Sequence, residues 1–551
     1  MKVPKKVLFF SPLRRTAGSL FSGPGPEGLR LDQGGEDEPL FTSLDQFHLC
    51  WIHAGSPEQA MDLLDEDYFS LLVLDLRAQS AEEIPHIGES LENLLHRLDH
   101  IEDPDLRYGF HRIVAVIDGP DQHGLDQILM NLGRAGVTHV YRRHDEDRHA
   151  MGHWLLDKAH DLIWHRRKGR TALCLAAGGI TGIYFHLGVM KCLSDCLSGD
   201  ALNDFDMYFG ISAGSIVCTA LNLGFSVDEI MAAIAQEKGG RIPAMDLNLL
   251  KLKHLNYRAV TKRLPRIMES LSRNQIRQAM NRPVREDSAL AVTDILRPPF
   301  RSDRFESLIR GVARSANTAN EFDDLERELY IGATDQDLRE HVLFGSEGYR
   351  NLPISKAIQA SMSINPAFAA VPIGGRYYED GAVTRTSNFS EALRRGADLI
   401  FVVDPFVPYV SKEAGLAHRK GLLYNVDQNL RTVSYTRFAN TRISLIRKHP
   451  DVSTYTFLPS NSTRPMLAVN PMDHRPWPGI WRAAYLSTLQ RLQALGHRLG
   501  GDLAPHDISL DFDRAIQVAE QLEAADRPVF RDFFPDRRPD IRRPPLTRPS
   551  R

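Results

Sequence analysis

The sequence predicts an α/β protein built from two consecutive regions of alternating strands and helices. In the first 168 residues five strand-like segments alternate with helix-like ones, and the alternation begins again from residue 169 around two glycine-rich turns. Strands that alternate with helices in this way favour parallel sheets covered by helices. We therefore expect a doubly wound domain over residues 1–168, an α/β/α three-layer domain over residues 169–526, and an Arg/Pro-rich disordered tail over residues 527–551.

Composition narrows the class of protein before any motif is considered. The chain has 551 residues, 42% of them hydrophobic and 25% charged, which is ordinary for a soluble globular protein. The net charge of −3 argues against a dedicated nucleic-acid binder. No apolar run reaches the length of a transmembrane helix, and the apolar stretch near the N-terminus is too short for a secretory signal. The five cysteines look like buried free thiols, so we expect a cytoplasmic protein.

The first region has strand-like and helix-like segments in regular succession. The strand-like segments are residues 6–10, 47–53, 69–77, 112–118 and 138–143. The helix-like segments are residues 57–64, 81–98, 125–134 and 148–165. Residues 18–38 are rich in glycine and proline and predict a mobile loop.

This first region resembles the receiver domain of response regulators, chiefly in residues 71–75 and 136–141. Asp75 stands where that family carries its phosphorylated aspartate. The acidic pair that holds magnesium in the family is replaced here by Ser11 and Pro12, so phosphoryl transfer to Asp75 lacks its charge clamp. We interpret the region as a structural or regulatory pseudo-receiver.

The second region follows a charged linker at residues 165–170. Its strand-like segments are residues 171–175, 206–211, 329–333, 376–379 and 399–403, and its first helices are residues 183–197 and 213–223. Between the second and third of these strands, a mainly helical insertion is expected over about residues 226–325.

A serine flanked by two glycines stands at the strand-to-helix turn that matters most for function. The sequence Gly210-Ile211-Ser212-Ala213-Gly214 follows a buried strand and opens a helix. A serine in so tight a turn exposes its hydroxyl at the positive end of the helix, and small neighbours leave room for the turn and for a carbonyl. This pattern predicts that Ser212 is a nucleophile.

A glycine-rich turn precedes this serine in the chain. Residues 176–182 contain Gly178, Gly179 and Gly182 between a strand and a helix. Backbone amides at such a turn can hold the oxyanion of a tetrahedral intermediate or a phosphate. The lysine that a nucleotide-binding P-loop requires is missing, which favours the oxyanion role. Nucleotide binding and a purely structural turn are the two remaining alternatives.

An aspartate follows a later strand, in the sequence Glu379-Asp380-Gly381-Ala382. Asp380 ends the strand, and we expect Gly381 to adopt a positive φ. Taken alone, this pair also fits an ordinary Asp-Gly turn.

The three motifs in this order resemble the patatin-like phospholipase family, over about residues 170–410 and including residues 356–368. The resemblance implies Ser212 as nucleophile, Asp380 as its base, Gly178 and Gly179 as oxyanion donors, and no metal or organic cofactor. Aspartate is a weaker base than histidine, and partial burial would raise its pKa toward the working range.

Two departures from the family pattern bear on activity. Ala177 replaces the first of three glycines, and Thr181 replaces a basic residue. A weakly active or inactive protein that binds lipid as a regulatory scaffold therefore stays open. A Ser–His–Asp triad is a further alternative, for which the candidate histidines are His418, His449, His474, His497 and His506.

The preferred function is a lipid acyl hydrolase of the phospholipase A or lysophospholipase type, with a thioesterase or neutral-lipid hydrolase as the alternative enzyme. The segment from Arg241 to Arg285 holds eleven basic residues against two acidic ones, with apolar residues at helical spacing. Such a segment suits peripheral binding to an anionic membrane, although an ordinary surface helix has the same pattern.

Overall fold

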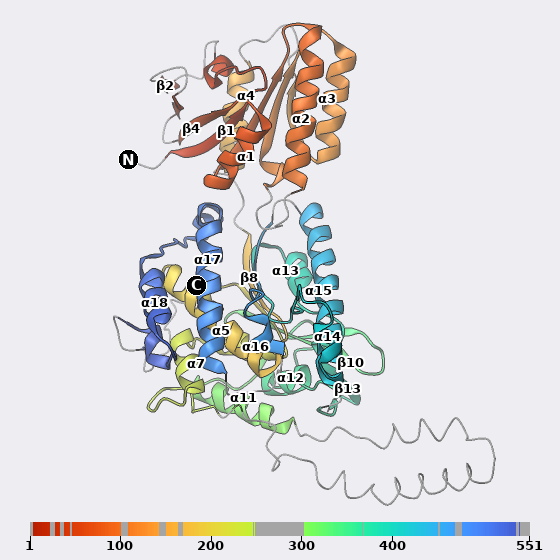
Figure 1. The fold of residues 1–551 in the computed structure, drawn as a ribbon, viewed down its shortest axis with the longest axis vertical. Coiled ribbons are helices and arrows are strands. Elements are labelled where there is room, and N and C mark those ends of the chain that lie inside the picture. The colour runs from red at the N-terminus through yellow and green to blue at the C-terminus, as the bar shows by residue number, and fades with distance from the viewer. Residues whose placement is uncertain are drawn as a thin grey trace, which may run out of the picture. The chain divides into compact units, whose positions relative to one another are not determined.

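The computed structural model describes most of the chain. The described residues are 4–21, 28–32, 38–44, 47–100, 108–142, 150–163, 169–245, 247, 302–365, 367–449, 452–468, 476–535 and 539. They form two compact units (Figure 1). The first unit takes in Met1–Gly169, Ile443–Ser453 and Ala494–Ser509, and the second takes in Arg170–Arg442, Thr454–Gln493 and Leu510–Arg551. The boundaries of the domains remain a prediction.

The first unit is built on a mostly parallel sheet. Its strands are β1 (Lys5–Phe10), β2 (Arg30–Asp32), β3 (Leu40–Leu44), β4 (Phe47–Ala54), β5 (Leu71–Arg77), β6 (Ile113–Asp118) and β7 (His139–Arg142). They lie in the order β2-β3-β4-β1-β5-β6-β7, and the five strands from β4 to β7 pair in parallel. Numbered among themselves, these five have the order 2-1-3-4-5 of a flavodoxin-like doubly wound sheet. The predicted fold class is confirmed for this region.

Helices cover both faces of this sheet because its strands are apolar on both sides. Leu8 and Phe10 pack with one set of helices, whereas Val7 and Phe9 face the opposite side. The first set is α1 (Pro57–Glu66), α2 (Ile84–Asp99) and α3 (Gln122–Ala135), and the opposite face packs on α4 (Ala150–Ile163). All nine sequence-predicted elements of the region are present, with ends shifted by a few residues.

The prediction that residues 18–38 form only a loop is wrong in part. The 3-10 helix η1 (Ala17–Phe21) and the strand β2 lie within or across this segment, and β2 pairs with β3 as an antiparallel edge. All three residues of β2 are exposed. The strand is therefore held by backbone pairing, which leaves no hydrophobic pattern in the sequence.

Asp75 lies in β5 and is buried. Its two carboxylate oxygens accept hydrogen bonds from the Arg77 guanidinium at 2.6 and 2.9 Å, and the same guanidinium donates to the Ser19 hydroxyl. A side-chain cation of the protein thus neutralises this carboxylate. The pairing agrees with a pseudo-receiver, but the resemblance to receivers remains a prediction.

The second unit is built on an eight-stranded sheet. Its strands are β8 (Arg170–Leu175), β9 (Met207–Ile211), β10 (Glu328–Asp335), β11 (His341–Phe344), β12 (Val371–Ile373), β13 (Arg376–Asp380), β14 (Ala397–Val403) and β15 (Ser453–Phe457). The order is β12-β13-β10-β9-β8-β14-β15, with β11 also paired to β10. Strands β10, β9, β8 and β14 are parallel to one another, and β13 runs antiparallel to β10.

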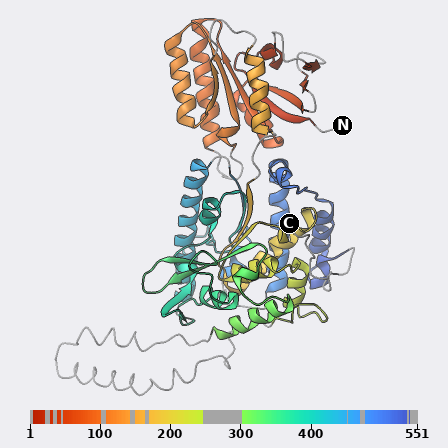
Figure 2. The ribbon, with the colours of Figure 1, turned by 180° about the vertical axis from the view of Figure 1, so that it is seen from behind.

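The helices of the second unit lie on two faces of its sheet (Figures 1 and 2). They are α5 (Gly179–Cys196), α6 (Ala213–Asn222), α7 (Val227–Ile234), α11 (Asp303–Ser315), α12 (Ile354–Ser361), α13 (Phe389–Arg394), α14 (Leu416–Arg419), α15 (Leu422–Lys448), α16 (Arg464–Ala468), α17 (Trp477–Leu503) and α18 (Asp513–Ala524). The chain moves from β8 to β9 in one direction along the sheet and returns through α13 to β14 on the other side of β8. The strand order therefore reverses at β8, which makes β8 the topological switch point of the parallel strands.

Several sequence predictions lie outside the described residues. These include residues 248–301 of the helical insertion, most of the basic segment from Arg241 to Arg285, and all but one residue after 535. The prediction of a disordered tail over residues 527–551 is wrong at its start, because Phe530–Phe533 form the 3-10 helix η10 and the buried Phe533 ring packs on Trp481. Within the insertion the described elements α7, α11 and the 3-10 helix η7 (Phe322–Asp324) are helical, as predicted. Arg241 pairs with Glu229 and stacks on Phe225, so this member of the basic segment has a structural partner.

Two general predictions can be compared with the described residues directly. All five cysteines are buried and unpaired, as the sequence predicted. Among the helices that the structure describes, none combines the length and the apolar character needed to cross a bilayer.

Candidate active site

Ser212 lies at a strained turn between β9 and α6. Its backbone has φ 49° and ψ −118°, a conformation that non-glycine residues rarely adopt. The Ser212 amide donates to the Ser361 hydroxyl at 2.8 Å, and that hydroxyl donates in turn to the Gly332 carbonyl at 2.6 Å. The side chain of Ser361, at the end of α12, therefore ties the turn to the neighbouring strand β10.

Gly210 and Gly214 have no room for a side chain, because backbone atoms of other residues lie where their Cβ atoms would be. A Cβ on Gly210 would come within 2.4 Å of the Ser215 Cα, and one on Gly214 within 2.1 Å of the Leu175 carbonyl oxygen. Strand β9 and helix α6 can approach each other and the end of β8 only without these atoms. This explains the two glycines around Ser212 as a packing requirement of the turn.

Replacing Gly214 by alanine is expected to lower the free energy of unfolding by about 3 kcal/mol or more, because the new methyl group meets backbone that cannot move aside. Urea unfolding followed by circular dichroism measures this change. The matched control is Gly311→Ala within α11, where a Cβ would have no heavy atom within 4 Å. That control is expected to gain about 0.5–1 kcal/mol from helix propensity. Equal effects of the two substitutions would contradict the packing argument.

The glycine-rich turn after β8 leads into the N-terminus of α5. Gly179 has φ +65°, and a Cβ on Gly178 would come within 2.5 Å of the Pro405 Cγ. The first turn of α5 touches the serine turn, since a Cβ on Gly182 would lie 3.6 Å from the Ala213 Cβ. The first amides of a helix have no partner inside the helix, so this end of α5 offers donors beside Ser212.

Thr181 and Ala177, the two departures from the family pattern, are both buried. The Thr181 hydroxyl lies 3.4 Å from the carbonyl oxygens of Gly178 and Leu467. Its side chain therefore stabilises the turn from inside. A basic side chain at this position would need a different path to reach solvent or a lipid headgroup.

Asp380 ends β13 and is held in place on several sides. Its amide donates to the Ser363 carbonyl at 3.1 Å, and its carboxylate accepts from the Ala382 amide at 2.9 Å. The Ser212 side chain lies close enough to this carboxylate to lower its pKa. The structure thus brings together Ser212 and Asp380, which are 168 positions apart in the sequence.

Burial sets the protonation behaviour of Asp380. Its side chain is buried, and desolvation raises the pKa to about 7 even though the hydrogen bonds from the Ala382 amide and Ser212 lower it. The neighbouring Glu379 adds a smaller upward shift of the same pKa. A carboxylate with such a pKa is a far better proton acceptor at neutral pH than an ordinary aspartate.

The expectation that Gly381 adopts a positive φ is wrong. Gly381 begins the 3-10 helix η8 (Gly381–Val383) and does not have a positive φ. Its role is steric, because a Cβ would come within 2.5 Å of the Gly332 carbonyl oxygen. The glycine lets the residue after Asp380 pack directly against β10.

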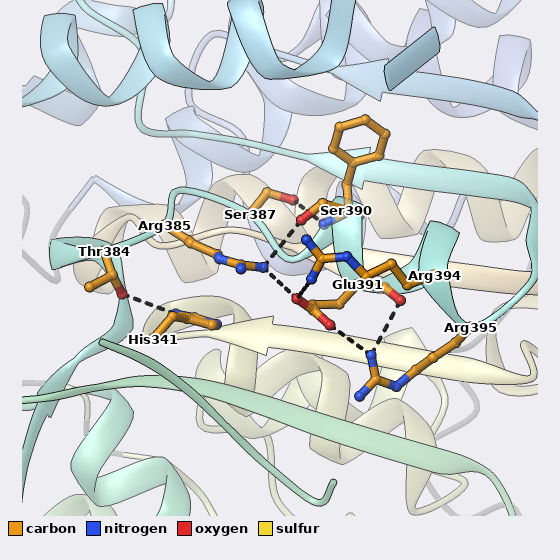
Figure 3. Close-up of polar contacts among 9 residues, drawn as sticks. His341, Thr384, Arg385, Ser387, Ser390, Glu391, Arg394 and Arg395 are labelled. Carbon is orange, nitrogen blue, oxygen red and sulfur yellow. Dashed lines mark hydrogen bonds and ion pairs between the residues drawn. The ribbon is translucent and has the colours of Figure 1, made fainter. Parts of the chain in front are cut away.

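A chain of side-chain hydrogen bonds supports the backbone of Asp380 from behind. The Thr334 hydroxyl donates to the Asp380 carbonyl at 3.0 Å and lies 2.9 Å from the Thr384 hydroxyl. The Thr384 hydroxyl is in turn 3.0 Å from Nδ1 of His341 (Figure 3). Burial lowers the pKa of His341 to about 4, so its ring is neutral at physiological pH.

Beside this chain, three arginines converge on one carboxylate in α13 (Figure 3). Arg385, Arg394 and Arg395 donate to Glu391 at 2.7, 2.5 and 2.8 Å. Burial alone would raise the pKa of Glu391, but the hydrogen bonds from Arg385 and Arg395 outweigh it, and the pKa is lowered. This cluster fastens the segment after Asp380 to the helix that leads into β14.

Two residues near the site were missed by sequence reasoning. Ser361 lies inside the segment used for the family resemblance, but a lone serine at a helix end has no distinctive pattern. Asp404 follows β14, is fully buried, and accepts from the Phe406 amide at 2.8 Å. Burial raises its pKa to about 7, with Arg431 opposing the shift. An Asp-Pro pair after a strand was the signal that could have drawn attention to it.

The histidines named for a triad are dispersed along the described chain. His418 lies in α14, His449 follows α15, and His497 and His506 belong to the first unit. His474 lies outside the described residues. The Ser212 side chain lies near the Asp380 carboxylate and lowers its pKa, which favours the aspartate over these histidines.

A family model matches a continuous part of the chain. Residues 173–393 match the family model of the patatin-like phospholipases. The chain thus contains a patatin-like phospholipase domain, and its general class is lipid acyl hydrolase. The matched range includes Ser212, Asp380 and the glycine-rich turn.

Two solved structures are among those similar to the chain. VipD from Legionella pneumophila is 12% identical, with 65% of this chain and 74% of that chain covered and a TM-score of 0.26. ExoU from the type III secretion system of Pseudomonas aeruginosa, in complex with SpcU, is 16% identical, with 64% and 61% covered and a TM-score of 0.22. A search of curated protein sequences gave no significant match. Similarity at these TM-scores says nothing about substrate or partners.

Proposed function

We propose that this protein is a phospholipase A or lysophospholipase that cleaves acyl esters with Ser212 as nucleophile and Asp380 as general base. The observation that carries the proposal is that the Ser212 side chain lies close to a buried carboxylate, that of Asp380, whose pKa burial raises to about 7 and Ser212 partly lowers. The strained turn at Ser212 and the match of residues 173–393 support it.

The reaction would run in two halves through an acyl-enzyme. The Ser212 Oγ attacks the ester carbonyl carbon while the Asp380 carboxylate accepts the hydroxyl proton. The tetrahedral intermediate collapses, the bond to the alcohol breaks, and Asp380 returns the proton to the departing alkoxide. Water then attacks the acyl-enzyme, with Asp380 again taking and returning a proton, and releases the fatty acid and the free serine.

The negative charge on the carbonyl oxygen would be stabilised by backbone amides at the start of α5. We assign this role to Gly178 and Gly179, because they lie where the chain enters the first turn of that helix. The same turn packs beside the serine turn at Gly182. A Cβ added to Gly182 would lie 3.6 Å from the Ala213 Cβ. The assigned donors therefore belong to the element that lies against the nucleophile.

Labelling with a fluorophosphonate probe tests the proposal without knowledge of the natural lipid. Such a probe reacts with a serine only where a base and an oxyanion site activate it. We expect one adduct per chain, located at Ser212 by peptide mass spectrometry, and no adduct in Ser212→Ala. The control is Ser194→Ala on α5, which should label like the wild type.

Absence of labelling in a folded wild-type protein would favour the regulatory scaffold over the enzyme. If Ser212 is labelled, release of fatty acid from diacyl and lyso-phospholipids, compared with thioesters and triacylglycerol, separates the proposed subtype from a thioesterase or neutral-lipid hydrolase. The contribution of the basic segment from Arg241 to Arg285 to membrane binding remains a proposal. Reversing the charges of Lys262, Arg263 and Arg266 tests it.

A further inference from the structure

Helix α15 buries polar side chains and exposes apolar ones, the opposite of an ordinary surface helix. The buried side chains include Gln428, Arg431 and Ser434, whereas the outward-facing ones include three large apolar residues. These are Val426, Leu430 and Val433, which are 46%, 57% and 58% exposed. Their spacing of four and three residues places them on one face of the helix.

The buried polar face of α15 is fully engaged by the protein. The Arg431 guanidinium pairs with Asp427 at 2.8 Å and donates to the carbonyls of Pro405 and Leu467 at 3.2 and 2.9 Å. The Gln428 side chain accepts from the Tyr409 amide at 2.8 Å. These contacts fix the orientation of the helix, so its apolar face cannot turn inward.

The same helix touches both halves of the candidate active site. Pro405, bonded to Arg431, packs against the glycine turn at Gly178. On the other side, the Arg437 guanidinium donates to the Thr384 carbonyl at 3.5 Å, four residues after Asp380. The exposed face of α15 therefore lies on an element that flanks the site.

Two further exposed valines lie next to residues that contact α15. Val383, which is 40% exposed, precedes the Thr384 carbonyl that Arg437 contacts. Val410, which is 59% exposed, follows Tyr409, whose amide contacts Gln428. We call Val383, Val410, Val426, Leu430 and Val433 together the α15 face.

The segment that carries most of the α15 face has more basic than acidic residues. Between residues 407 and 441 the sequence has five basic residues and two acidic ones. Both carboxylates are paired, Glu413 with Arg419 and Asp427 with Arg431. Within the described part of the chain, Lys412, Lys420 and Arg437 have no carboxylate partner. Exposed apolar side chains among unpaired cations complement an anionic lipid surface.

We propose that the α15 face docks the protein on an anionic bilayer beside the candidate active site. This inference rests on the proposed function, because a lipid hydrolase must reach a substrate that resides in a membrane. It uses residues that are separate from the basic segment at 241–285.

Binding of the full chain to phosphatidylcholine vesicles, with and without phosphatidylserine, tests the inference. The variant Val426→Gln/Leu430→Gln/Val433→Gln is expected to bind both kinds of vesicle at least tenfold more weakly. The variant Lys412→Glu/Lys420→Glu should lose affinity several-fold for the anionic vesicles only, with a weaker dependence on salt. The matched control is Ile516→Gln/Val529→Gln, two exposed apolar residues elsewhere in the second unit.

Turnover of a monodisperse short-chain ester separates this inference from the proposed function. The triple glutamine variant and the double glutamate variant are both expected to keep wild-type turnover of that ester, and circular dichroism checks that they are folded. If vesicle binding is unchanged in both variants while the soluble ester is hydrolysed, the docking surface is wrong and the proposed function stands. If the triple glutamine variant loses vesicle binding but the wild type cleaves no ester, the proposed function is wrong. If the wild type is a dimer, and the triple glutamine variant is a monomer with unchanged vesicle binding, the α15 face binds a second copy of the chain. That result would overturn the inference.

Discussion

Replacing Ser212 by alanine is expected to lower kcat for ester hydrolysis by about 10⁴-fold or more, because it removes the hydroxyl that we propose as the nucleophile. Alanine has the same backbone preferences as serine to a first approximation, so the strain at φ 49° stays in the variant. We therefore expect the free energy of unfolding to change little. Initial rates with a soluble ester, and urea unfolding, measure the two quantities.

A second substitution at the same position separates catalysis from strain. Ser212→Gly should be as inactive as Ser212→Ala but more stable by about 1 kcal/mol, because glycine adopts a positive φ without penalty. Residual activity in both variants within tenfold of the wild type would show that another residue is the nucleophile. Ser194→Ala serves as the control for an uninvolved serine.

Much of the fold could be predicted because the deciding signals are local. Buried parallel strands such as β5 and β9 are continuous apolar runs, and the glycines beside Ser212 report a tight turn directly. The hairpin strand β2 could not be predicted in this way, since its three residues are exposed and its partner supplies only backbone hydrogen bonds.

The candidate site was predictable in its motifs and not in its environment. The order of the motifs singled out Ser212 and Asp380, but the raised pKa of Asp380 depends on burial that arises only when β13 packs beside β10. The clamp by Ser361 and the second buried carboxylate at Asp404 are likewise products of tertiary packing. The exposure of Val426, Leu430 and Val433 on α15 could not be predicted either, because apolar residues at helical spacing ordinarily predict a buried face.

Replacing Asp380 by asparagine is expected to lower kcat by about 10²–10⁴-fold and to remove its dependence on pH near neutrality. In the wild type, the carboxylate must be ionised to accept the Ser212 proton. Activity should therefore rise with pH through about 7, the pKa of Asp380, and reach a plateau above it. A pH profile of kcat for both proteins measures this difference.

The free energy of unfolding of the wild type should fall as pH rises through about 7, whereas the activity rises. The folded pKa of Asp380 is raised to about 7 from an ordinary value of 3.8, so the folded protein holds the proton more tightly than the unfolded chain. The contribution of this group to stability is fully present below pH about 4 and is lost as pH rises through about 7. Asparagine does not ionise, so Asp380→Asn should gain stability relative to the wild type over this window, by about 4 kcal/mol at pH 8.

Asp404 is the necessary control because burial raises its pKa to the same value of about 7. Asp404→Asn should show a similar gain in stability at pH 8 but keep the rising limb of activity, because Asp404 does not contact Ser212 through any hydrogen bond of the described residues. If the rising limb disappears in Asp404→Asn and persists in Asp380→Asn, the general base is Asp404. If both variants keep it, the base is neither carboxylate, and a histidine outside the described residues such as His474 becomes the candidate.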